Sequence, residues 1–103
     1  MLSAIFLIPI KDNRTRKLHR QATFKEFENG LLIRFGGWTF HGFVYGSWID
    51  KNERIIYDIS RKYEVGCLKT KDLYTLECYI KQSKAIFGQE AIYTTICGAN
   101  KLL

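Results

Sequence analysis

Four polar side chains alternate along a segment with the two-residue period of a β-strand. Asp58, Ser60, Lys62 and Glu64 would share one face of that strand, and His41 on the preceding strand could join them. Carboxylate, imidazole and hydroxyl groups in a covered apolar cleft can transfer protons, because such a cleft shifts their pKa values. The same alternation also arises where one face of a sheet meets water. The segment therefore nominates an acid–base or ligand site, with a solvated sheet face as the alternative.

Other familiar site chemistries find no support in the residues. The two histidines, His19 and His41, are too few and too far apart to indicate a metal, so no metal site is expected. The cysteines at positions 67, 78 and 97 contain no Cys-x-x-Cys pair, which favours a reducing, cytoplasmic environment over a disulfide framework. No serine or cysteine stands in a nucleophile elbow, and no glycine-rich phosphate loop is present. We therefore expect no cofactor.

The formal charge of +6 is concentrated in one short segment. Positions 11 to 20 contain one acidic residue, Asp12, and five basic ones: Lys11, Arg14, Arg16, Lys17 and Arg20. A basic cluster of this kind can recruit phosphate or nucleic acid, although a charged loop is often simply solvated. The segment is therefore a candidate anion-binding surface.

The aromatic and glycine residues between Phe35 and Trp48 are a second feature that would suit nucleic-acid binding. Flat rings on an open sheet face can stack on bases, and glycine lets a ligand come close. The stretches 5–7 and 42–45 are loosely similar to the two aromatic motifs of RNA recognition motif domains, but the longer one lies on the second strand instead of the third. Packing of these rings in a core or a dimer interface is the favoured interpretation.

The order of the elements predicts the scaffold that must position these residues. The hydrophobic pattern predicts four strands and two helices, with a short tail at 98–103: strands at 3–10, 38–49, 54–65 and 89–97, and helices at about 23–36 and 71–87. Two β-α-β halves in this order form a ferredoxin-like α+β fold, a four-stranded antiparallel sheet with both helices on one face. At 103 residues, we expect one domain, 1–103.

Local signals refine the expected ends and faces of these elements. Thr23 and Glu26 have the spacing of a capping box, Gly36-Gly37 is the expected stop of the first helix, and Gly88 that of the second. On the third strand the alternation predicts that the helices cover one set of side chains: Ile55, Tyr57, Ile59 and Val65.

The first strand is apolar at nearly every position from Ser3 to Ile10. It is too short to span a bilayer, so no membrane partner is expected. An apolar run of this kind is typical of a strand with both faces covered, whereas the helices cover only one. We therefore expect a homodimer formed through the open sheet face.

Several short motifs resemble a small bacterial family of unknown function. That family pairs a Gly-x-Trp with a Glu-x-Ser strand and a Phe-x-Gln-Glu step, and the matching stretches here are Gly46-Ser47-Trp48, Asp58-Ile59-Ser60 and Phe87-Gly88-Gln89-Glu90. The resemblance implies a ferredoxin-like fold and no known activity. If a site exists, it nominates Trp48, Asp58, Ser60, Gln89 and Glu90. As an alternative, Gln89 and Glu90 could satisfy backbone groups at the helix end, and Trp48 could fill the core.

Three functions remain open on these residues. The first choice is a non-catalytic binding or interaction module, because no chemistry looks assembled. The second is a small-ligand-binding protein or enzyme of the dimeric α+β barrel type, with its site around His41, Asp58 and Glu90. The third is a nucleic-acid-binding domain that uses the basic segment 11–20.

Overall fold

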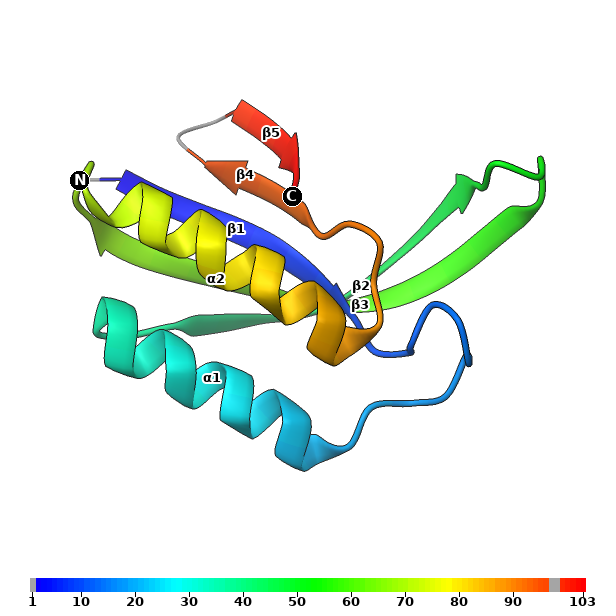
Figure 1. The fold of residues 1–103 in the computed structure, drawn as a ribbon, viewed down its shortest axis with the longest axis horizontal. Coiled ribbons are helices and arrows are strands. Elements are labelled where there is room, and N and C mark those ends of the chain that lie inside the picture. Colours follow the sequence, from blue (N-terminus) through cyan, green and yellow to red (C-terminus); the bar gives the residue numbers. More distant parts are fainter. Residues whose placement is uncertain (1, 97–98) are drawn as a thin grey trace.

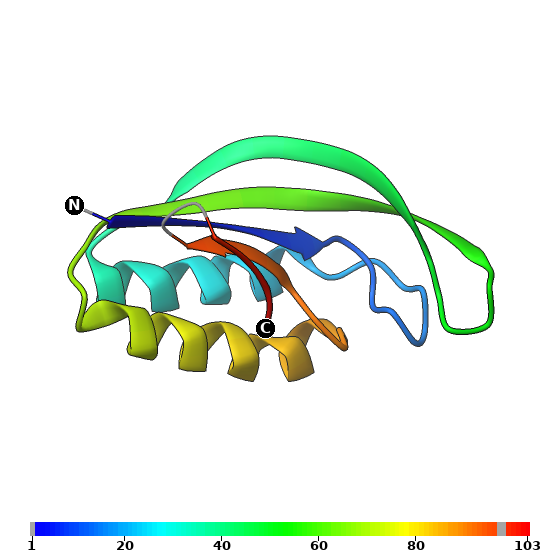
Figure 2. The ribbon, with the colours of Figure 1, turned by 90° about the horizontal axis from the view of Figure 1, so that it is seen from above.

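The predicted order of elements is confirmed in the computed structural model, which describes residues 2–96 and 99–103. The chain forms β1 (Leu2–Pro9), α1 (Gln21–Phe35), β2 (Thr39–Ile49), β3 (Ile55–Leu68), α2 (Asp72–Phe87), β4 (Tyr93–Ile96) and β5 (Ala99–Leu102). The strands pair antiparallel in the order β2-β3-β1-β4-β5. Both helices lie on one face of this sheet, as Figures 1 and 2 show, and the other face carries no helix. The ferredoxin-like α+β architecture is thus as predicted.

The C-terminal segment departs from the prediction. Ala99–Leu102, expected to be part of a tail, is the short fifth strand and pairs with β4 at the edge of the sheet. Within the described residues β4 begins only at Tyr93, because residues 89–92 first carry the chain from the helix end to the sheet. Ile92 and Leu103 then exchange both backbone hydrogen bonds at 3.2 Å, which joins the end of the chain to the sheet. Cys97 and Gly98, predicted as strand and tail, lie outside the described residues.

The two helices end at the glycines that were predicted to stop them. Gly36 and Gly88 adopt left-handed backbone conformations, with φ of 83° and 61°, and their N–H groups bond back to carbonyls of the last turns. The start of α1 differs from the prediction. The helix begins at Gln21, so Thr23 lies inside its first turn, and no side chain caps the amide groups. The predicted capping box is therefore wrong.

The core lies between the helices and the sheet. Every second side chain of β1 from Ala4 to Ile8 points into it, and the buried stripe of α1, which consists of Phe24, Phe27 and Leu31, meets them there. Phe27 of that stripe is in ring contact with four aromatic side chains: Phe6, Tyr63, Tyr79 and Phe87. This packing holds the helices against one face only and leaves the opposite side chains of β1 on the helix-free face. Among the described residues, no helix is long and apolar enough to cross a membrane.

The far half of the β2–β3 hairpin extends beyond the helices. Residues 43–59, called the hairpin arm below, project from the body of the molecule in Figure 1. Val65 is buried under the helices as predicted, but Ile55, Tyr57 and Ile59 on the arm are 44–59% exposed. The prediction that the helices cover all of these side chains is therefore wrong, because β3 is longer than the helical layer.

Candidate functional site

A pocket of about 790 Å³ opens on the helix-free face of the sheet. Its floor crosses the central strands, where Leu7 of β1 lies opposite Lys62 of β3, and Pro9 lies opposite Ser60. Residues from β2, β4 and the two loops at the same end complete its walls. The lining comprises Ile5, Leu7, Pro9, Asn13, Val44, Tyr45, Gly46, Ser47, Trp48, Asp58, Ser60, Lys62, Gln89, Glu90, Ala91, Tyr93 and Thr95. The open sheet face is therefore hollowed and does not present a flat polar surface.

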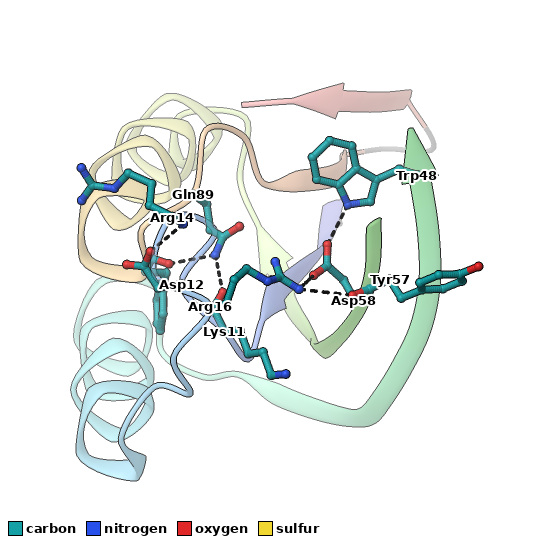
Figure 3. Close-up of polar contacts among 9 residues, drawn as sticks. Lys11, Asp12, Arg14, Arg16, Trp48, Tyr57, Asp58 and Gln89 are labelled. Atoms are coloured by element: carbon teal, nitrogen blue, oxygen red, sulfur yellow. Dashed lines mark hydrogen bonds and ion pairs between the residues drawn. The ribbon is translucent and has the colours of Figure 1, made fainter. Parts of the chain in front are cut away.

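Asp58 is the best-positioned charged group of this pocket. Its side chain is only 19% exposed, and its Oδ2 accepts a hydrogen bond of 2.7 Å from the Trp48 indole N–H. The Arg16 guanidinium approaches from the opposite side, at 3.5 Å from Oδ1 and 3.4 Å from the carbonyl oxygen of Tyr57. Figure 3 shows the carboxylate between the indole and the guanidinium. Two donors from separate segments therefore hold the orientation of one carboxylate.

The strand periodicity brings some of the predicted polar residues together and separates others. Asp58, Ser60 and Lys62 all line the pocket, and Ser60 is buried. Glu64 and His41 do not line it. Instead, the His41 Nε2 lies 2.7 Å from the Glu64 Oε1. The register of β2 against β3 shifts between Phe40 and Phe43, so His41 lies on the far side of an irregularity from the pocket wall.

Gln89 and Glu90 stand at the rim of the pocket, where α2 ends. The Gln89 side-chain amide donates to the carbonyl oxygens of Lys11 and Phe87, both at 2.8 Å. It therefore satisfies backbone groups at the helix end, which was the alternative role that the sequence suggested. Glu90 lines the pocket and is exposed, so it supplies a second carboxylate within reach of a bound molecule.

The basic segment 11–20 forms one side of this site. The N–H groups of Thr15 and Arg14 donate to the Asp12 carboxylate and lower its pKa, which stabilises the turn. The loop is also attached to the end of α2, since the Asn13 N–H donates to the Gly88 carbonyl oxygen. Lys11, Arg14, Lys17 and Arg20 are exposed, whereas Arg16 turns toward Asp58.

The side chain of His19, in the same loop, packs against both helices. Its ring packs at 5.2 Å from that of Phe87 and at 5.9 Å from that of Phe24, and its Nε2 is buried without a hydrogen-bond partner. Burial lowers the pKa of His19, which favours the neutral form of the imidazole. Within the part of the chain that the structure describes, no three His, Cys, Asp or Glu side chains come together as a metal site would require.

Several pocket residues were not nominated as site residues by the sequence analysis, among them Ile5, Leu7, Asn13 and Tyr93. The two β1 side chains carried a signal, since an apolar strand face without a helix must meet something other than water. Asn13 and Tyr93 carried none, because Asn13 approaches the pocket from a loop and Tyr93 from β4, which has only 4 residues.

The fold is similar to that of a phage enzyme. The solved structure of a phage SAM lyase in complex with S-methyl-5'-thioadenosine matches with a TM-score of 0.74 and 14% sequence identity, over 99% of this chain and 86% of that chain. The solved structure of a phage SAM lyase in the apo state matches with a TM-score of 0.71 and 15% identity, over 97% of this chain and 83% of that chain. These matches show a shared fold. No protein-family model and no curated protein sequence matches the chain, so the motif resemblance stays a prediction.

Proposed function

We propose that the pocket on the helix-free sheet face binds a small sulfur-substituted adenosine, of the class that includes S-methyl-5'-thioadenosine and S-adenosylmethionine. The observation that carries the proposal is the Asp58 carboxylate, largely buried in a mostly apolar pocket and oriented by the Trp48 indole. Buried, aligned carboxylates surrounded by apolar walls are characteristic of ligand sites.

The pocket has the size and the surfaces that such a ligand needs. Its volume of about 790 Å³ lies in the range of roughly 300–1,000 Å³ typical of small-molecule sites. The aromatic side chains of Trp48 and Tyr93 offer flat surfaces for a purine, and Ile5 and Leu7 offer an apolar floor for an S-methyl group. Because the Asp58 carboxylate accepts hydrogen bonds, it suits ribose hydroxyls. It would also stabilise a sulfonium cation by charge.

The similarity to the phage lyase supports this ligand class. That protein, which binds S-methyl-5'-thioadenosine according to its structure, shares the fold over nearly the whole of this chain. At 14% identity the likeness is evidence for the fold alone, so the neighbour's ligand suggests which class to test, and the size and lining of the pocket support its binding here. Turnover of the ligand would make the protein an enzyme, and the carboxylates Asp58 and Glu90 are the groups we nominate for that chemistry.

The other two functions stay predictions. A non-catalytic interaction module gains no support from an apolar pocket with an aligned carboxylate. A nucleic-acid interface on segment 11–20 would use the exposed Lys11, Arg14, Lys17 and Arg20, but not Arg16 in its present contact with Asp58. Such binding should weaken steeply with salt. The expected homodimer through the open sheet face would cover the pocket and also stays a prediction.

Isothermal titration with S-methyl-5'-thioadenosine tests the proposal. We predict saturable binding by the natural protein, and at least tenfold weaker binding by Asp58→Asn, equivalent to about 1.4 kcal/mol or more. The matched control is Glu64→Gln, which also neutralises a carboxylate of β3 but lies outside the pocket, paired with His41. Equal losses in both variants, or no binding by the natural protein, would refute the assignment of the pocket.

A further inference from the structure

The outer edge of β2 lacks the features that usually protect an edge strand. β2 stands first in the sheet order, so among the described strands only β3 pairs with it. Its unpaired N–H and C=O groups form a ready template for another strand. The eleven residues Thr39–Ile49 contain no Asp, Glu, Lys, Arg or Pro, although charged side chains and prolines normally block such an edge.

The half of β2 that lies on the hairpin arm is regular and apolar. Residues 43–49 pair with 55–61 of β3 without a shift of register, while the irregularity at Gly42 lies before them. Six large apolar side chains therefore share one face of the arm: Phe43, Tyr45, Ile49, Ile55, Tyr57 and Ile59. They are between 44% and 71% exposed, and the rings of Tyr45 and Tyr57 stack on each other at 6.2 Å.

We propose that this edge pairs with the same edge of a second copy of the chain. An antiparallel pairing of β2 with its symmetry mate about Gly46 would set Phe43 opposite Ile49 of the partner copy, and Tyr45 opposite Ser47. Because Thr39–Ile49 contains no Asp, Glu, Lys or Arg, the two strands could meet without these charges facing each other, despite the net charge of +6. A strand that is its own partner forms a closed two-fold dimer.

The apolar side chains of the edge strand contribute part of the area that a stable dimer needs. At roughly 200 Å² for each large side chain, the exposed parts of Phe43, Tyr45 and Ile49 amount to about 400 Å² per copy. Standard interfaces bury about 800 Å² per partner, and the strand backbone and its flanking residues would add to the side chains. The pairing joins two sheets edge to edge along the strand whose residues 44–48 also line one wall of the pocket.

Light scattering coupled to size exclusion tests this pairing. At a loading concentration of about 100 µM we expect twice the chain mass of 12.1 kDa. The double variant Tyr45→Lys/Ile49→Lys should elute as a monomer, because it sets charges on the paired edge. Ile33→Lys, at a side chain of α1 that is 82% exposed, is the matched control and should remain a dimer.

Hydrogen exchange, measured residue by residue, tests the same pairing without the use of variants. In the natural protein the outward amide protons of residues 43–49 should become more protected as concentration rises, while those of α1 should not change. A monomer at the highest concentration would overturn the proposal. So would an assembly that survives Tyr45→Lys/Ile49→Lys, since it must then use another surface.

Discussion

At the scale of single residues, the contrast between Asp58 and Glu64 shows what strand periodicity can and cannot predict. Both carboxylates were expected on one face of β3, yet only Asp58 lines the pocket, while Glu64 pairs with His41. Periodicity assigns a face, but it does not say how far a pocket extends along that face. Arg16 was predicted as part of the basic segment, but its contact with Asp58 was beyond prediction, since it joins residues 42 positions apart through a loop.

A second cluster of charged residues lies on the helix side and stabilises the fold. The Tyr63 hydroxyl donates to the Glu28 carboxylate at 2.7 Å, and the Arg61 guanidinium lies 3.3 Å from the same oxygen. Arg61 also stacks on the ring of Phe40 at 4.1 Å. The Arg61 and Glu28 side chains are only 13% and 12% exposed, so each depends on the other for its charge partner.

Removal of Glu28 is therefore expected to be costly. We predict that Glu28→Ala lowers the free energy of unfolding by about 3 kcal/mol, because it leaves the Arg61 guanidinium largely buried without an anion. Urea denaturation measures the change. Arg54→Ala removes a guanidinium that is 71% exposed, and the Asp50 carboxylate keeps its backbone N–H donors from residues 52 and 54, so this variant should cost less than about 1 kcal/mol. Similar losses in the two variants would contradict the role assigned to burial.

At the scale of elements, the helix ends were predictable and the strand lengths were not. Gly36 and Gly88 mark their stops because glycine adopts the left-handed conformation at no steric cost. The start of α1 was misplaced, since Thr23 and Glu26 have capping-box spacing but lie one turn too late to cap. β5 was missed because four residues, Ala99–Leu102, are too few to show a period. The hairpin arm is exposed because the helices do not extend over it, and the residue pattern of a strand does not indicate how far the helices extend.

The two helix stops differ in what surrounds them, and this difference gives a prediction. A Cβ added at Gly36 meets no atom within 4 Å, whereas one added at Gly88 collides with the Asp12 carboxylate. Gly36→Ala should cost about 1–2 kcal/mol of unfolding free energy, from its positive φ alone. Gly88→Ala should cost at least about 1 kcal/mol more, because the turn around Asp12 must also move. Thermal or urea unfolding of the pair tests this, and equal costs would argue against the contact.

At the scale of the whole molecule, one asymmetry connects the fold to the proposed function. Both helices cover the same face, so the apolar side chains Ile5 and Leu7 of β1 lie on the other. The sequence indicated that this strand is apolar on both faces, and we expected its helix-free face to be a subunit interface. In the structure the same side chains form the floor of a pocket, with Asp58 beside them. The apolar strand therefore marks the face that holds the pocket, and the expected dimer through this face stays a prediction.

The two tryptophans allow the central claim to be measured directly. The Trp48 indole N–H bonds to Asp58 in the pocket, whereas Trp38 lies outside the lining and packs on Tyr63. In a nitrogen–proton correlation spectrum titrated with S-methyl-5'-thioadenosine, the account predicts a saturable shift of the Trp48 indole signal and an unchanged Trp38 signal. A Trp48 signal that stays in place at saturating ligand, or equal shifts of both signals, would contradict it.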